Sequence, residues 1–185
     1  MGLGRVCVAL AMMVAMAPMV WAAEQGDSDK PQAVDFRELK KLFPEKLGDL
    51  KRTEASGEKM KMGEYVMSMA RAEYAKENDE SDAAPGIELE VMDYGGTKGM
   101  SEGFSAWANL DLDKESDDGY ERTVKVAGHP GLESYRKSEK SGELQLFVGG
   151  RFLVHVRVTN LPAEQIKKTA EAYPLDKLAA LKPAK

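Results

Sequence analysis

Four methionines in two closely spaced pairs are the residues whose types and spacing most resemble a metal site. Met60 and Met62 are separated by one residue, and so are Met67 and Met69. Thioethers are soft ligands that suit Cu(I) or Ag(I). Because alternate residues of a strand share a face, an extended segment directs Met67 and Met69 to the same side. We expect these methionines to fill irregular gaps in the core, with a soft-metal site at Met60, Met62, Met67 and Met69 as the alternative.

The acidic segment 111–119 resembles the beginning of a calcium loop. It starts with Asp111, Asp113 and Glu115 at alternate positions. An EF-hand that begins at Asp111 needs glycine at its sixth position and glutamate at its twelfth, where this chain has Ser116 and Arg122. The expected structure is a solvated loop, with an irregular calcium site as the alternative.

Acid–base chemistry would depend on two histidines. A hydrolase would need carboxylates such as Glu88, Asp93 or Glu133 to converge in space with His129 or His155. The spacing of these residues does not itself indicate convergence. Two histidines with no cysteine in the exported chain also disfavour structural zinc, and we predict no cofactor.

Two glycine-containing segments follow the strand expected at 87–91. The segment Gly95–Gly99 could present backbone N–H groups to an anion, but it lacks the GxxxxGK[ST] pattern of a nucleotide loop. The segment Gly103–Trp107 lacks the second glycine of a nucleophile elbow. We expect a glycine turn and the start of a helix here.

The candidate partner surface is one face of a hairpin near the C-terminus. It consists of Phe147, Arg151, Leu153, His155 and Arg157, a mixed apolar and basic set in an acidic chain. Where a helix covers this face, Phe147 and Leu153 are ordinary core. Where it stays open, it is a docking face for an anionic or protein partner. We expect partial helix cover.

The N-terminus has the pattern of a secretory signal peptide. Arg5 precedes an apolar run from Val6 to Val20, and the expected cleavage follows Ala22. Removal of residues 1–22 eliminates Cys7, the only cysteine, and lowers the formal net charge from −5 to −6. We therefore expect an exported protein, periplasmic or secreted, with no transmembrane segment in the mature chain. Its acidity disfavours nucleic acid as a partner.

The remaining pattern predicts a flexible leader over residues 23–34 and a single α+β domain over 35–182. The expected order is a helix capped by Asp35, two strands, a helix at 100–108, four strands, and a C-terminal helix that begins near Pro162. Short turns between strands favour a mostly antiparallel sheet of about six strands with helices packed on it. In the last hairpin we predict a three-residue loop, 148–150, with Leu146 opposite Phe152 and Leu144 opposite Val154.

The hairpin sequence Gly149–Val154 (GGRFLV), with Gly119–Arg122 before it and Leu175–Leu178 after it, resembles a group of exported bacterial proteins of unknown function. The resemblance spans Leu39 to Leu181. The layout is also similar to the PsbP/Mog1-like α/β sandwich, a fold that implies extracytoplasmic binding or assembly factors.

The leading expectation is a non-enzymatic exported domain that binds an envelope partner or a small ligand. The alternatives are a periplasmic Cu(I)-binding protein and a hydrolase with a non-standard acid/His site.

Overall fold

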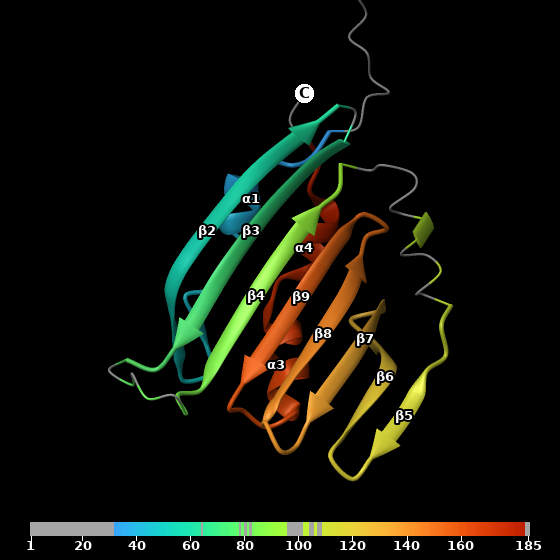
Figure 1. Ribbon diagram of the computed structural model, residues 1–185. Coiled ribbons are helices and arrows are strands. Elements are labelled where there is room, and N and C mark those ends of the chain that lie inside the picture. The colour runs from blue at the N-terminus through green and yellow to red at the C-terminus, as the bar shows by residue number, and fades with distance from the viewer. Residues whose placement is uncertain are drawn as a thin grey trace, which may run out of the picture.

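A single antiparallel sheet of nine strands forms the body of the protein. The computed structural model describes residues 32–63, 65–77, 79, 81, 83–95, 102–103, 106 and 109–183. Within them the strand order is β1-β2-β3-β4-β9-β8-β7-β6-β5, so β4 and β9 are neighbours near the middle (Figure 1). The strands are β1 Lys46–Leu47, β2 Leu50–Met62, β3 Tyr65–Ala75, β4 Gly86–Asp93, β5 Asp113–Ser116, β6 Gly119–Val126, β7 His129–Arg136, β8 Ser141–Val148 and β9 Phe152–Thr159.

The predicted fold class, α+β with about six strands and helices packed on them, was wrong. The sheet has nine strands, and strands occupy far more of the chain than helices do. The missed strands include β2 and β5, whose residues are mostly solvent-exposed. Without a buried face, neither strand has the apolar–polar alternation by which a strand is recognised in a sequence.

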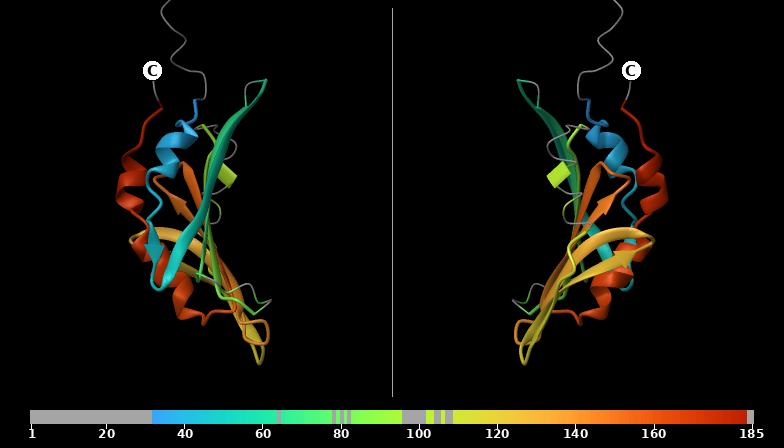
Figure 2. Two further views of the ribbon diagram at one scale, coloured as in Figure 1. Left: turned by 90° about the vertical axis from the view of Figure 1, so that its left-hand side faces the viewer. Right: turned by 90° about the vertical axis from the view of Figure 1, so that its right-hand side faces the viewer.

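Short helices lie on one face of the sheet (Figure 2). They are α1 Phe36–Lys40, α3 Glu164–Ala172 and α4 Leu175–Ala180. Asp35 caps α1, because its carboxylate accepts the N–H of Arg37 at 2.8 Å. None of the described helices combines the length and apolarity needed to cross a bilayer. The four residues on which the expected helix at 100–108 depends, Met100, Phe104, Trp107 and Ala108, lie outside the described residues, as does the predicted signal peptide.

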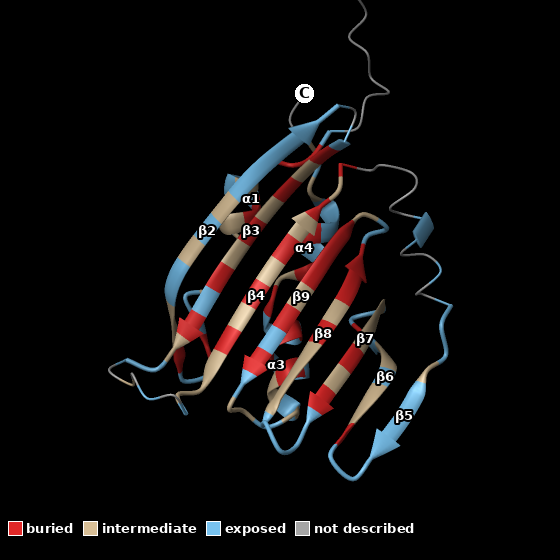
Figure 3. Cartoon of the chain, in the orientation of Figure 1, coloured by how far each residue is buried: buried red, intermediate tan, exposed pale blue. Residues whose placement is uncertain are grey.

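The core lies between these helices and the sheet. Residues of β3 and β4 alternate between buried positions and positions that are partly or fully exposed (Figure 3). Ile166 of α3 and Leu178 of α4 are fully buried and belong to the core cluster formed with Leu89, Leu146 and Val156. We call this side the helix-covered face and the opposite side the second face. Ala33 and Val34, at the end of the expected leader, are also buried.

The last hairpin has the predicted loop length but a different register. Val148 pairs with Phe152 and Leu146 pairs with Val154, so the loop is 149–151 and the predicted pairing was wrong by two residues. Gly149 and Gly150 both have positive φ values, 60° and 68°, which places both in the turn. Val148 is buried and remains in the strand. The apolar side chains of the two strands still meet, because a two-residue shift preserves the faces.

Candidate functional site

A group of four methionines lies on the second face, across β2, β3 and β4. Met60 of β2 is directly opposite Met67 of β3, and Met69 of β3 is directly opposite Met92 of β4. Opposite residues of an antiparallel pair have Cβ atoms roughly 5 Å apart. Met67 and Met69 are two positions apart on one strand, so the two pairs lie side by side. We call Met60, Met67, Met69 and Met92 the thioether cluster.

Met62 lies at the margin of this cluster. It belongs to the same face of β2 as Met60, but its cross-strand partner is Tyr65 rather than a methionine. Of the four candidate metal ligands, the structure therefore places Met60, Met67 and Met69 together. It leaves Met62 one step closer to the turn.

The thioether cluster lies outside the hydrophobic core. Met60 is 50% exposed and Met62 is 70% exposed, whereas Met67, Met69 and Met92 are half-buried. None of them belongs to the core cluster. Methionines that are partly or half exposed on a sheet face do not match the filling of an internal gap.

The local sequence of β3 explains why these methionines face away from the helices. Ser68, Ala70 and Ala72 are fully buried on the helix-covered face. The intervening residues, including Met67 and Met69, must point to the second face. Small side chains therefore lie under the helices, and the long flexible thioethers stay on the other side.

Met92 was not predicted from the sequence to belong to this cluster. In β4, Leu89 and Val91 are buried, so Met92 shares a face with Glu88 and Glu90. The sequence alone indicated that Met92 shares a face with these polar residues, because alternate residues of a strand point to the same side. What the sequence did not show is that β4 pairs with β3 in the register that puts Met92 opposite Met69.

Thioether ligands define what this site can bind. They carry no proton at neutral pH and prefer soft monovalent ions to Ca²⁺ or Mg²⁺. Glu58 of β2 is directly opposite Met69, but its carboxylate is a hard oxygen donor that such ions do not prefer. In the described part of the chain, no three His, Cys, Asp or Glu side chains come together as a metal site.

The apolar part of the predicted partner surface is buried. Phe147 and Leu153 are directly opposite each other on β8 and β9, and they are 8% and 7% exposed. Both are on the second face, whereas α1, α3 and α4 lie on the other. Because both side chains are buried, neither Phe147 nor Leu153 is available to a partner at the surface.

The basic residues of that predicted surface are engaged with carboxylates. His155 Nε2 lies 3.0 Å from Glu143 Oε2, and Arg157 donates to Glu88 Oε1 at 3.2 Å. Glu88 also accepts a hydrogen bond from Arg71 of β3 at 2.5 Å. The second face therefore carries a band of paired charges beside the thioether cluster rather than a basic patch.

Arg151 binds a buried carboxylate instead. Its guanidinium donates to both oxygens of Asp93, and Asp93 also accepts the backbone N–H groups of Val34 and Gly95. Asp93 is fully buried. All of these interactions join segments of the fold, which assigns Asp93 a structural role.

The carboxylates proposed for acid–base chemistry are held at three separate places. Glu133 is buried on the helix-covered face, where it accepts hydrogen bonds from Tyr120 at 2.6 Å and Arg122 at 2.9 Å. Burial and the hydrogen bond to Glu133 raise the pKa of Tyr120 well above its usual value. Across the described residues, no hydrogen bond or ion pair joins Glu88, Asp93 or Glu133 to a histidine, and His129 begins β7 after the Ala127–Gly128 turn. The structure does not bring the predicted acid/His site together.

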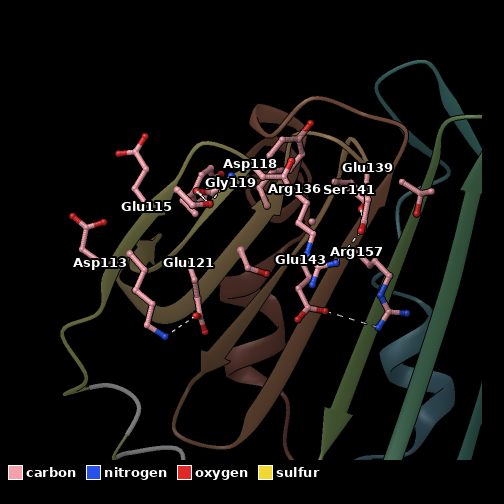
Figure 4. A pocket seen from close by; sticks show the side chains of 18 residues that line it. Asp113, Glu115, Asp118, Gly119, Glu121, Arg136, Glu139, Ser141, Glu143 and Arg157 are labelled. Atoms are coloured by element: carbon pink, nitrogen blue, oxygen red, sulfur yellow. Dashed lines mark hydrogen bonds and ion pairs between the residues drawn. The ribbon is translucent and has the colours of Figure 1, made fainter.

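A wide hollow of about 1150 Å³ lies where β5 to β9 approach the turns at Asp118 and Glu139 (Figure 4). Several of its charged side chains pair with one another, as Lys114 does with Glu121 and Arg136 with Glu139. The expected calcium-loop residues Asp113 and Glu115 line this hollow from strand β5. An extended strand does not wrap its carboxylates around one ion, so the geometry here does not match a calcium loop.

The remaining predicted features fall mostly on residues that the structure does not describe. Gly95 is buried and has a φ of 66°, but residues 96–99 of the expected glycine turn lie outside the described residues. Ser105, in the segment Gly103–Trp107, also lies outside the described residues.

No protein-family model, curated protein or solved structure matches this chain.

Proposed function

We propose that this domain binds a soft monovalent metal ion, Cu(I) or Ag(I), through the thioether cluster. The observation that supports this is the adjacency of two cross-strand methionine pairs, Met60–Met67 and Met69–Met92, on the second face, where Met60 is 50% exposed. Four thioethers on three neighbouring strands offer the three or four sulfur ligands that such an ion takes.

The sheet favours this role because it fixes the ligands before the metal arrives. Antiparallel pairing joins β2 to β3 across the whole cluster, and it joins β3 to β4 from Ser68 onward. Methionine side chains are flexible, so the sulfurs can converge while the backbone stays in place. A rigid backbone lowers the entropy cost of binding.

The predicted export of the chain fits the same chemistry. Thiols oxidise outside the cytoplasm, whereas thioethers remain soft ligands that form no disulfide. The only cysteine of the chain lies within the predicted signal peptide. Methionine is then the remaining sulfur ligand of the exported domain.

A second candidate uses the same face for the apolar segment of an envelope partner. The observation in its favour is Tyr65, which is 64% exposed beside Met62. Methionine-rich surfaces also bind apolar peptides, because the side chain adapts to different shapes. The two candidates differ in what they require: the metal needs sulfur, whereas the peptide needs only apolar bulk.

Leucine substitution separates the two functions. The mature protein is titrated with Cu(I) under anaerobic conditions in competition with bicinchoninate, and the bound ion is examined by X-ray absorption. We expect a sulfur coordination shell for the wild-type protein. The Met67→Leu/Met69→Leu variant should weaken the affinity at least about tenfold.

Glu58→Gln is the matched control, since it removes a carboxylate beside Met69 and keeps every sulfur. It should leave the affinity within about twofold of the wild-type value. No Cu(I) binding by the wild-type protein would overturn the proposal. Retention of a partner by the double leucine variant would instead favour apolar docking.

A further inference from the structure

Met62 differs from the thioether cluster in its position and in its exposure. At 70% it is more exposed than Met60. It faces Tyr65 rather than another methionine, next to a turn in which Gly63 has a φ of 61°. It is therefore a fifth sulfur on the same face but outside the two paired sets.

The end of the β2–β3 hairpin extends past its neighbour in the sheet. The pairing of β3 with β4 begins at Ser68 and Asp93, so Tyr65 to Met67 have no partner on β4. Figure 1 shows both strands continuing beyond the end of β4. This part of the hairpin is accessible to another molecule from its tip.

The five sulfurs form a series from the tip to the interior of the sheet. Met62 comes first, Met60 and Met67 follow, and Met69 with Met92 lie deepest along the strands. Exposure falls in the same direction, from 70% and 50% to half-buried. An incoming soft ligand reaches Met62 before any other sulfur of the series.

We infer that Met62 is an exchange ligand through which Cu(I) passes between the thioether cluster and a sulfur-bearing donor or acceptor. This inference rests on the proposed function. Soft ions move between proteins by ligand replacement, in which a new sulfur binds before the old one leaves. The partner it implies is a molecule that presents a thioether or a thiolate of its own, because these are the ligands that compete for the same ion.

An exchange ligand has a kinetic signature that a retention ligand lacks. It lowers the activation barrier for both loading and release of Cu(I), and it does not bind the ion in the final loaded state. Its removal therefore slows loading and release equally and leaves the equilibrium affinity unchanged. A retention ligand is one that holds the ion in the loaded state. Its loss speeds the release of Cu(I) and therefore weakens the equilibrium affinity.

The test measures transfer of Cu(I) from the loaded protein to bathocuproine disulfonate by stopped-flow absorbance, over a range of chelator concentrations. For Met62→Leu we expect transfer about tenfold slower than for the wild-type protein. We expect its equilibrium affinity to stay within about twofold. Met69→Leu should weaken the affinity instead.

Tyr65→Leu is the matched control at the tip of the hairpin. Tyr65 is exposed to nearly the same extent as Met62, at 64%, and is directly opposite it, but carries no sulfur. Its replacement should alter neither rate nor affinity. An equal slowing by Tyr65→Leu, or an unchanged rate in Met62→Leu, would overturn the role of Met62 while leaving the proposed metal site intact. A wild-type protein that binds no Cu(I) would overturn both.

Discussion

The guanidinium of Arg151 reaches both carboxylate oxygens of Asp93, from Nε to Oδ1 and from a terminal nitrogen to Oδ2, at 2.7 Å in each case. The pair joins the end of β4 to the loop between β8 and β9. The same carboxylate holds the N–H of Val34, and the same guanidinium donates to the carbonyl of Gln32 at 2.6 Å. One buried ion pair therefore fixes the N-terminal segment, the end of β4 and the last hairpin to one another.

Replacement of Asp93 by asparagine should destabilise the protein strongly. It leaves the largely buried guanidinium of Arg151 without a countercharge, a change that typically costs about 3–5 kcal/mol. Urea unfolding followed by circular dichroism measures the loss. Glu139→Gln serves as control, because it breaks an exposed pair with Arg136 and should change stability little. Equal stabilities of the two variants would contradict the structural role of Asp93.

Leu153→Ala should reduce the free energy of unfolding by about 2–5 kcal/mol, as expected for a buried leucine. This outcome distinguishes a packed residue from an exposed docking residue, because an exposed leucine contributes little to the free energy of unfolding. Leu110, which is exposed, provides the comparison. Leu110→Ala should change stability by no more than about 0.5 kcal/mol. A neutral Leu153→Ala variant would instead favour the alternative in which this face stays open to a partner.

Stability should fall at alkaline pH, and Tyr74 should contribute to the fall. Burial raises the pKa of Tyr74 to about 12, from an ordinary value of 10.0. The folded state then keeps a proton that the unfolded state loses, so this stabilisation is complete below pH 10 and is lost as the pH rises toward 12.

Tyr74→Phe tests this dependence. At neutral pH the variant should lose about 0.5–1.5 kcal/mol, because the Tyr74 hydroxyl donates to the carbonyl of Pro44 at 2.9 Å. Between pH 10 and 12 its stability should decline less steeply than that of the wild-type protein. Urea titrations at a series of pH values provide both quantities. Parallel pH profiles would show that Tyr74 does not titrate differently in the two states.

Gly57→Ala should loosen the contact between α1 and the sheet. A Cβ at this position would lie 2.7 Å from Cδ2 of Phe36 and 2.9 Å from the carbonyl oxygen of Met69. Overpacking of this kind costs about 1–3 kcal/mol. Gly86→Ala is the matched control, since its nearest neighbour would be 3.9 Å away. Thermal or urea unfolding measures the stability of both variants. An unchanged stability of Gly57→Ala would mean that Phe36 moves aside freely.

The sequence was most informative where one face of a strand is buried. The alternation around Ala70 and Met69 predicted β3, and that around Leu89 and Glu88 predicted β4. It was least informative for β2, because a strand with exposed side chains on both faces has no period to detect. Hence the partner strand of Met67 and Met69 could not be predicted.

The candidate site depended on register, which is a long-range property. The two Met-x-Met pairs were visible in the sequence, but the opposition of Met60 to Met67 follows from the β2–β3 pairing, and that of Met69 to Met92 follows from the β3–β4 pairing. The same limit explains the hairpin at Gly149. Both of its glycines are needed in the turn, and only the buried position of Val148 reveals that the strand continues up to them.

The strand order also determines which event completes the folding of this protein. Strands β1 to β4 follow one another in space as they do along the chain, and so do β5 to β9, each group with its own helices on the same side. Contacts within each group are local and form at a small entropic cost. The seam between β4 and β9 joins residues far apart in the sequence, such as Gly86 and Thr159, and requires the closure of a long loop. We therefore expect the two halves to form before the seam, which Asp93 and Arg151 join at one end, and we expect closure of the seam to be the slow step of folding.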